Sequence, residues 1–175
     1  MTATEIPIDE PLAARLALAL ELLGEKVLVQ RAVGLLEGRN EGEDMLLYVG
    51  GRHAQGILDG APPLYWPELW GARALLHIWD DSAASVVLTH LGNQAWRVRE
   101  MCLRVCAVRQ LGDSKTFARR LTDENPRVRS AAARAIAAVG ASSDAERLTP
   151  LLRDPDKEVK RAASEALKLL ERRHS

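Results

Sequence analysis

The sequence predicts an all-α protein, a right-handed α–α superhelix of about four to five helical hairpins. Two observations support this fold class. Hydrophobic residues make up 47% of the 175 residues but aromatic residues only 4%, a composition typical of helices that pack through small side chains. A segment anchored on a valine also recurs, at Val98, Val128 and Val159, and its apolar residues have helical spacing. We therefore expect one solenoid over residues 1–175.

The N-terminal third, residues 1–66, is predicted to form irregular capping helices before the regular repeats of residues 67–175. A stripe of leucines after Pro11 predicts the first helix, and its members are Leu12, Leu16, Leu20 and Leu23. Residues 25–37 are predicted to be its partner helix, although the segment VLVQ is also typical of a strand. Between residues 38 and 66 Gly and Pro are frequent, and only residues 45–49 indicate the start of a helix. An irregular first repeat is typical of a solenoid end, where the core must be capped.

The recurring segments are predicted to be the second helices of successive hairpins. Counted from each valine, positions +3, +4, +7 and +8 are apolar and lie on one side of an α-helix. In chain order they hold Met101, Cys102, Val105 and Cys106, then Ala131, Ala132, Ala135 and Ile136, then Ala162, Ala163, Ala166 and Leu167. A weaker copy counted from Gly71 holds Ala74, Leu75, Ile78 and Trp79. Shorter stretches at about 82–91, 114–121 and 144–152 predict the first helices. One hairpin alone leaves its apolar face exposed, so the hairpins are expected to stack.

The best copies share the pattern D-x-x-P-x-V-R-x-A-A-x-x-A-L, with small variations. One copy supplies Asp123, Pro126, Val128, Arg129, Ala131, Ala132, Ala135 and Ile136, and the next supplies Asp154, Val159, Lys160, Ala162, Ala163, Ala166 and Leu167. The pattern resembles HEAT repeats, including the variants named for phycobilisome-lyase-like proteins, over about Ser82 to Glu171. Met101, Cys102 and Lys160 depart from the usual residues. The resemblance implies a superhelical scaffold that binds proteins or, less often, nucleic acids.

Three polar pairs with a separation of six residues are predicted to be structural. They are Asn93 with Arg99, Asp123 with Arg129, and Asp154 with Lys160. The family resemblance implies that these positions form hydrogen-bonded ladders along the stack. A guanidinium at the edge of the buried stripe can satisfy turn carbonyls and a carboxylate together. A basic stripe that binds DNA is the alternative interpretation of these basic residues.

A second set of residues, at positions −1, +2 and +6, is predicted to face away from the core and to form a concave partner-binding face. The predicted partner-binding residues are Trp70, Arg73, His77, Arg97, Arg104, Arg127 and Arg134. Stacking is expected to bring Arg104 beside Arg134, while Glu158 and Glu165 reverse the charge at one end. Guanidinium groups bind carboxylates and phosphates well, so we expect a protein partner with an acidic or phosphorylated patch. A merely solvated face is the alternative.

Charge and motif content argue against several other classes. Acidic and basic residues balance at 24 each, so net charge gives no reason to expect a nucleic-acid or membrane partner. Cys102 and Cys106 are predicted to pack in the core, since a zinc site needs about four ligands. We expect no metal and no cofactor. Neither a signal peptide nor a transmembrane helix is predicted, and a cytoplasmic location is expected.

The main prediction is a scaffold or adaptor without enzymatic activity, because no nucleophile elbow, Walker loop or dinucleotide fingerprint is present. The best enzyme alternative is a helical-repeat alkylpurine DNA glycosylase. Its aromatic and acidic residues would be Trp66, Trp70, Trp79, Trp96 and Asp80. Such an enzyme stacks the damaged base on indole rings and stabilises the developing sugar cation with a carboxylate. Trp79 lies on the apolar stripe, however, which favours core packing.

Overall fold

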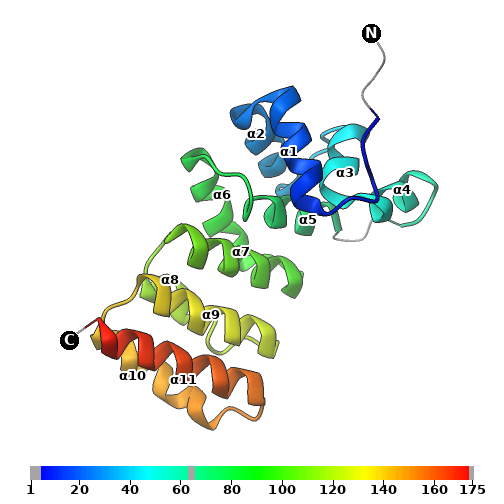
Figure 1. The fold of residues 1–175 in the computed structure, drawn as a ribbon. Coiled ribbons are helices and arrows are strands. Elements are labelled where there is room, and N and C mark those ends of the chain that lie inside the picture. Colours follow the sequence, from blue (N-terminus) through cyan, green and yellow to red (C-terminus); the bar gives the residue numbers. More distant parts are fainter. Residues whose placement is uncertain (1–4, 63–65, 174–175) are drawn as a thin grey trace. The chain divides into compact units, whose positions relative to one another are not determined.

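The computed structural model describes residues 5–62 and 66–173, without the Trp66 side chain, and the regular secondary structure of these residues is helical. Helices, turns and loops account for these residues, and no strand occurs among them (Figure 1). The predicted all-α class is therefore confirmed. Two compact units divide the chain, Met1–Val86 and Val87–Ser175, and each is described by itself. No helix in the described ranges has the length and apolar character needed to cross a bilayer.

The described part of the N-terminal unit contains five α-helices that lie wholly within it. They are α1 (Leu12–Leu23), α2 (Glu25–Leu36), α3 (Glu43–Gly50), α4 (Arg52–Leu58) and α5 (Trp66–Ala74). Leu28, Leu35 and Leu36 are fully buried, at the helical spacing that places one face of α2 in the core. The VLVQ segment therefore lies in a helix, and its interpretation as a strand is wrong. α2 packs mainly against α5.

The weaker copy counted from Gly71 is not a helix through Trp79. α5 ends at Ala74, and residues 75–77 form turns. Leu75 and Ile78 are still buried, so the apolar pattern was a correct indicator of the core but not of helix length. Gly71 allows the close approach of α5 to α2, because a Cβ atom at this position would lie 2.5 Å from the Ala32 carbonyl oxygen.

The C-terminal unit has three long second helices, each preceded by a short first layer. The long helices are α7 (Trp96–Arg109), α9 (Pro126–Val139) and α11 (Lys157–Arg172). The first layer comprises α6 (Ala84–Thr89) with η2 (His90–Gly92), then α8 (Ser114–Ala118), then η3 (Ser142–Asp144), α10 (Ala145–Leu148) and η4 (Thr149–Arg153). The predicted stretches 82–91 and 144–152 are helical, but each is divided between a short α-helix and 3-10 turns, and α8 ends at Ala118, before the predicted residue 121. Pro150 explains one interruption, since it lacks the N–H that a continuous α-helix would need there.

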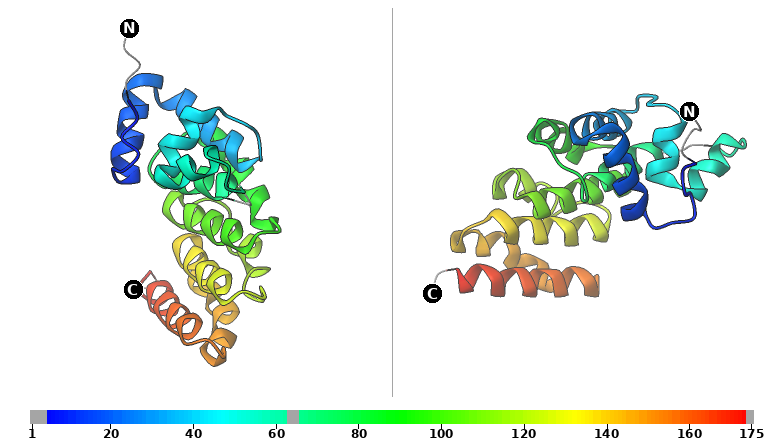
Figure 2. Two further views of the ribbon diagram at one scale, coloured as in Figure 1. Left: turned by 90° about the vertical axis from the view of Figure 1, so that its right-hand side faces the viewer. Right: turned by 45° about the horizontal axis from the view of Figure 1, so that its top comes forward.

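The three long helices of this unit lie side by side in chain order. α9 packs against both α7 and α11, and the ribbon shows all three running in the same direction (Figures 1 and 2). Side-chain caps define where two of the helices begin: the Asn125 carboxamide accepts the Arg127 N–H at 3.0 Å, and the Asp156 carboxylate accepts the Glu158 N–H at 2.8 Å. α9 and α11 thus begin at equivalent positions, whereas α7 begins after Ala95, which provides no side-chain cap.

Candidate partner-binding surface

The buried side of α7, α9 and α11 fixes which residues face solvent. The three anchor valines are fully buried, and so are the two alanines at +3 and +4 in α9 and α11. In α7 the larger Met101 and Cys102 take these positions and are buried as well. Because the apolar stripe faces the core in all three helices, positions −1 and +6 point away from it.

Two arginines hold successive repeats in register. Arg99 donates from Nε and Nη2 to both oxygens of Asp123, each at 2.8 Å, and from Nη1 to the Asn93 carbonyl at 2.9 Å. Arg129 repeats this geometry with Asp154 at 2.8 Å and with the Asp123 carbonyl at 2.9 Å. Each guanidinium thus binds the turn of its own repeat and the carboxylate of the next one.

The acceptor side of this ladder is also built identically in each turn. The side-chain oxygens of Asn93, Asp123 and Asp154 each accept the N–H two residues later, at 2.8, 3.0 and 2.9 Å. Lys160, which was predicted as the third basic member, is exposed, and its ammonium group makes no hydrogen bond or ion pair with the described residues, although its charge contributes to the lowered pKa of Asp154. The carboxylate that each ladder arginine binds thus lies in the following repeat. It does not lie six residues before the arginine, as the spacing had suggested.

Two rows of charged residues cross the exposed face of α7, α9 and α11. The proximal row is formed by position −1 and consists of Arg97, Arg127 and Glu158. The distal row is formed by position +6, about two helical turns further along, and consists of Arg104, Arg134 and Glu165. All six residues are exposed. Both rows therefore present two positive charges followed by one negative charge.

The proximal row is largely engaged within the protein. The Arg97 guanidinium lies over the Trp96 ring, 4.3 Å from its centroid, and that of Arg127 lies 5.8 Å from the same centroid. Arg127 also donates from Nε and Nη2 to Glu100 Oε1, each at 3.2 Å. Glu158 accepts from Arg161 Nη2 at 2.5 Å. Trp96 was considered only for the glycosylase alternative, and Glu100 was not among the predicted partner-binding residues. Their contacts with Arg127 depend on the packing register of α7 against α9, which the sequence of one helix does not reveal.

The distal row differs, because its charges are open to solvent. Arg104, Arg134 and Glu165 make no hydrogen bond or ion pair with any other residue in the described part of the chain. Each guanidinium thus keeps its donors available, in a geometry suited to carboxylate or phosphate. The distal row is the stronger candidate for contact with a partner.

Comparison with known proteins identifies these repeats. A family model described as HEAT repeats matches residues 84–168. This segment is a run of HEAT repeats. The crystal structure of an engineered protein, a Northeast Structural Genomics Consortium target, is similar with a TM-score of 0.57 and 22% identity, over 95% of this chain and 86% of that chain. That likeness shows the fold alone. Comparison with curated proteins gives no match.

The remaining predicted surface residues lie in the N-terminal unit, before the HEAT repeats. Trp70 is only 7% exposed, and its ring would lie 2.5 Å from a Cβ atom added at Gly50. Its place on a partner-binding face is therefore wrong, because α5 turns this ring onto α3. Arg73 and His77 are exposed. His77 lies beyond the end of α5, so it does not hold the helical position that the weaker copy assigned to it.

The two cysteines of the HEAT repeats are core residues of α7. Both are fully buried and free. Burial raises the pKa of the Cys106 thiol to about 12, and burial together with the neighbouring Cys106 raises the pKa of Cys102 further. Residues 5–62 and 66–173 contain no group of three or more side chains placed to hold a metal ion. Both thiols thus have a packing role.

The residues of the glycosylase alternative have other roles: Trp96 lies in the C-terminal unit under the Arg97 guanidinium, and the others lie in the N-terminal unit. The Asp80 carboxylate accepts the Ser82 N–H at 3.0 Å and caps η1 (Asp81–Ala83), and hydrogen bonds from the Ser82 hydroxyl and N–H lower the pKa of this carboxyl. The Trp79 indole donates to Asp81 at 3.0 Å. The Trp66 side chain lies outside the described residues. Asp80 is thus a helix-capping residue, as expected for an acid just before a helical turn.

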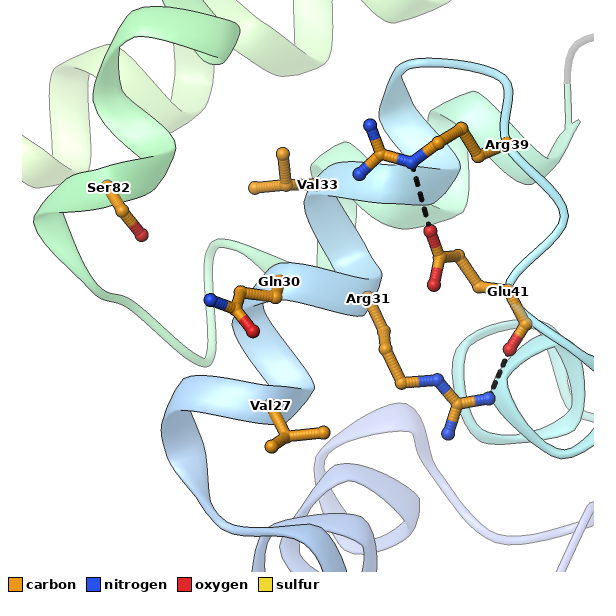
Figure 3. A pocket seen from close by; sticks show the side chains of 7 residues that line it. All are labelled: Val27, Gln30, Arg31, Val33, Arg39, Glu41 and Ser82. Carbon is orange, nitrogen blue, oxygen red and sulfur yellow. Dashed lines mark hydrogen bonds and ion pairs between the residues drawn. The ribbon is translucent and has the colours of Figure 1, made fainter.

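The N-terminal unit also contains a pocket of about 480 Å³ beside α2, shown in Figure 3. Its two arginines are held by neighbouring acids and carbonyls. Arg31 donates to both Asp44 oxygens, at 2.8 and 2.6 Å, and to the Glu41 carbonyl. Arg39 donates to Glu41 Oε1 at 3.2 Å and to Glu37. These pairings compensate the charges inside the pocket. A charged ligand would therefore find fewer available hydrogen-bond donors in the pocket than at the distal row.

Proposed function

We propose that the protein is a non-catalytic scaffold or adaptor that binds a protein partner on the exposed face of α7, α9 and α11. One observation carries this proposal: Arg104 and Arg134 occupy equivalent positions of adjacent HEAT repeats, are both exposed, and make no hydrogen bond or ion pair with the other described residues. Two guanidinium groups at a repeat spacing suit an acidic or phosphorylated patch. The partner is therefore proposed to carry such a patch.

The other features of the chain support a binding role in the cytoplasm. Both cysteines are free and buried, as is typical of proteins from reducing compartments. HEAT repeats build a rigid stack in which each repeat contacts its neighbours and leaves an extended surface for a partner. The chemistry available on this face is recognition by charge and shape.

The proposal is tested by affinity capture from a native cell extract, with quantification by mass spectrometry. The double variant Arg104→Glu/Arg134→Glu is expected to capture at least tenfold less of the partner, because its attraction to two acidic groups of the partner becomes repulsion. Arg119→Glu is the matched control, since Arg119 is an exposed arginine at the end of α8 and its reversal should leave capture unchanged. Equal capture by the wild type and the double variant would rule the proposed face out.

The wild type and the same variants can also be tested for binding of nucleic acid, which is the alternative function. Several phosphate contacts would make the affinity for duplex DNA fall steeply with salt concentration. Steep, arginine-dependent DNA binding would replace the protein partner with a nucleic acid on the same face. The balance of 24 acidic and 24 basic residues favours the protein partner.

A further inference from the structure

The charges of the distal row occur in a fixed order, which restricts what can bind there. Arg104, Arg134 and Glu165 lie on three adjacent helices, so the order along the row is positive, positive, negative. A partner segment that crosses the three helices meets these charges one after another. Complementarity then requires two acidic groups followed by one basic group.

An apolar strip runs beside the distal row, one helical turn further along each helix. Val108 is 60% exposed and Leu169 is 49% exposed, and the equivalent residue between them is Ala138. Few large apolar side chains in the described part of the C-terminal unit are this exposed. Val108 and Leu169 occupy equivalent positions of α7 and α11. The strip and the row together form a face with charge on one side and apolar surface on the other.

Part of this face is hollowed into a groove. It has a volume of about 320 Å³ between α9 and α11 and includes Ala137, Ala138, Ala166 and Leu169 among its lining residues. The charged residues Arg134, Glu165 and Arg173 also line it, and Arg173 is held by the Ala138 and Gly140 carbonyls, each at 3.0 Å. The small alanines leave room for an inserted apolar side chain, while the charges lie within reach of the same segment. A groove with this character is suited to an amphipathic helix.

The dimensions of an α-helix match the distal row. Adjacent packed helices are about 8–10 Å apart, so the three charges span about 16–20 Å. On an α-helix, residues seven apart are about 10.5 Å apart and lie nearly on one face. We propose that the distal row and the apolar strip bind an amphipathic α-helix of the partner. That helix carries two acidic residues seven apart, a basic residue seven further on, and apolar residues three or four positions from each charge.

This inference rests on the proposed function and is tested with two synthetic helical peptides of identical composition. One has the charge order Glu, Lys, Glu and the other Glu, Glu, Lys, at the same seven-residue spacing and with the same leucine stripe. Fluorescence anisotropy measures binding of each up to millimolar protein. The wild type is expected to bind the Glu, Glu, Lys peptide about tenfold more tightly, since the exchange turns two attractive contacts into repulsive ones.

A charge-preserving double variant provides the sharpest control. Arg134→Glu/Glu165→Arg keeps the net charge of the protein and changes only the order within the row. It is expected to reverse the preference of the two peptides, whereas Arg119→Glu should keep the wild-type preference. Leu169→Ser should weaken the binding of both peptides by a similar factor. Circular dichroism checks that each variant stays folded, which is expected because these residues are exposed.

Three results would overturn the inference: no binding of either peptide, equal binding of both, or an unchanged preference in the charge-exchanged variant. Any of these, combined with a captured partner that still depends on Arg104 and Arg134, would leave the proposed function standing and exclude the helical segment. Loss of that arginine dependence would instead contradict the proposed function itself.

Discussion

Ser130 shows at the scale of one residue how the HEAT repeats tolerate an imperfect core. It lies in α9 at position +2, which was predicted to face away from the core, but it is only 4% exposed, and its hydroxyl has no hydrogen-bond partner among the described residues. A buried polar group without a partner costs about 1–3 kcal/mol, and Ala is also the better helix former.

We predict that Ser130→Ala raises the free energy of unfolding by about 1 kcal/mol, because it removes the unsatisfied hydroxyl. Urea denaturation followed by circular dichroism measures the change. Ser143→Ala is a suitable control at an exposed serine, with an expected change within about 0.5 kcal/mol. A clear loss of stability in Ser130→Ala would mean that the hydroxyl contributes a favourable contact.

Cys102 and Cys106 are predicted to resist thiol reagents in the folded protein. Their thiols are buried and their pKa values are raised, so the reactive thiolate is scarce at neutral pH. Labelling with a maleimide should be slow in buffer and rapid in denaturant, and mass spectrometry counts the labelled thiols. Rapid labelling of the native protein would contradict the core position of α7.

At the scale of the element, the ladder that joins neighbouring repeats should contribute unequally at its two steps. The Arg99 and Asp123 side chains are 8% and 3% exposed, whereas those of Arg129 and Asp154 are 14% and 9% exposed. Removing one partner of a buried pair leaves the other charge unpaired, which costs about 3–5 kcal/mol.

Arg99→Met should therefore destabilise the protein strongly, towards the lower part of that range, because Arg120 Nη1 remains 3.7 Å from Asp123. Arg129→Met should cost less. Chemical denaturation of both variants against Lys160→Met, at a basic position without a ladder bond, measures the difference. Equal and small losses at all three positions would show that the ladder does not join the repeats.

The acid dependence of stability should follow from the same element. Burial acts to raise the pKa of Asp123, but hydrogen bonds from Arg99 and the Asn125 N–H outweigh it, so the pKa lies below the ordinary 3.8. A carboxyl with a lowered folded-state pKa stabilises the protein above its unfolded-state pKa, and this contribution is lost as pH falls.

The stability difference between the wild type and Asp123→Asn is thus expected to be greatest near neutral pH and to shrink below about pH 4. Thermal unfolding across this pH range measures it. A difference that stays constant with pH would mean that the charge of Asp123 does not stabilise the fold.

The sequence predicted the second helices better than the first ones, for a physical reason. α7, α9 and α11 bury their apolar stripes, with only Leu167 half-buried, so their periodicity is visible in one sequence. The first-layer elements are short and broken, and their limits depend on local features such as Pro150. The ladder carboxylates were identified, but their donors lie in the preceding repeat, since pairing between repeats depends on stacking register rather than on spacing in the chain.

At the scale of the whole molecule, the exposed face could be predicted in part. Arg97, Arg104, Arg127 and Arg134 are exposed as expected, because exposure follows from the same helical period. Which of them keep their charge free could not be predicted, since Glu100 and Trp96 reach the proximal row only through the packing of α7 against α9. Trp70 was misplaced because its ring packs onto α3 beside Gly50, a tertiary contact that the repeat pattern does not reveal.

The most direct test of the proposed surface places a photo-crosslinking amino acid at one exposed apolar position on each side of the HEAT repeats. Val108 in α7 is 60% exposed beside the distal row, and Leu152 in η4 is 41% exposed in the first layer. Crosslinking in native cells, followed by mass spectrometry, is predicted to join position 108 to an acidic segment of a partner protein and to leave position 152 unlinked. Partner crosslinks confined to position 152 would contradict the assignment of the binding surface to α7, α9 and α11.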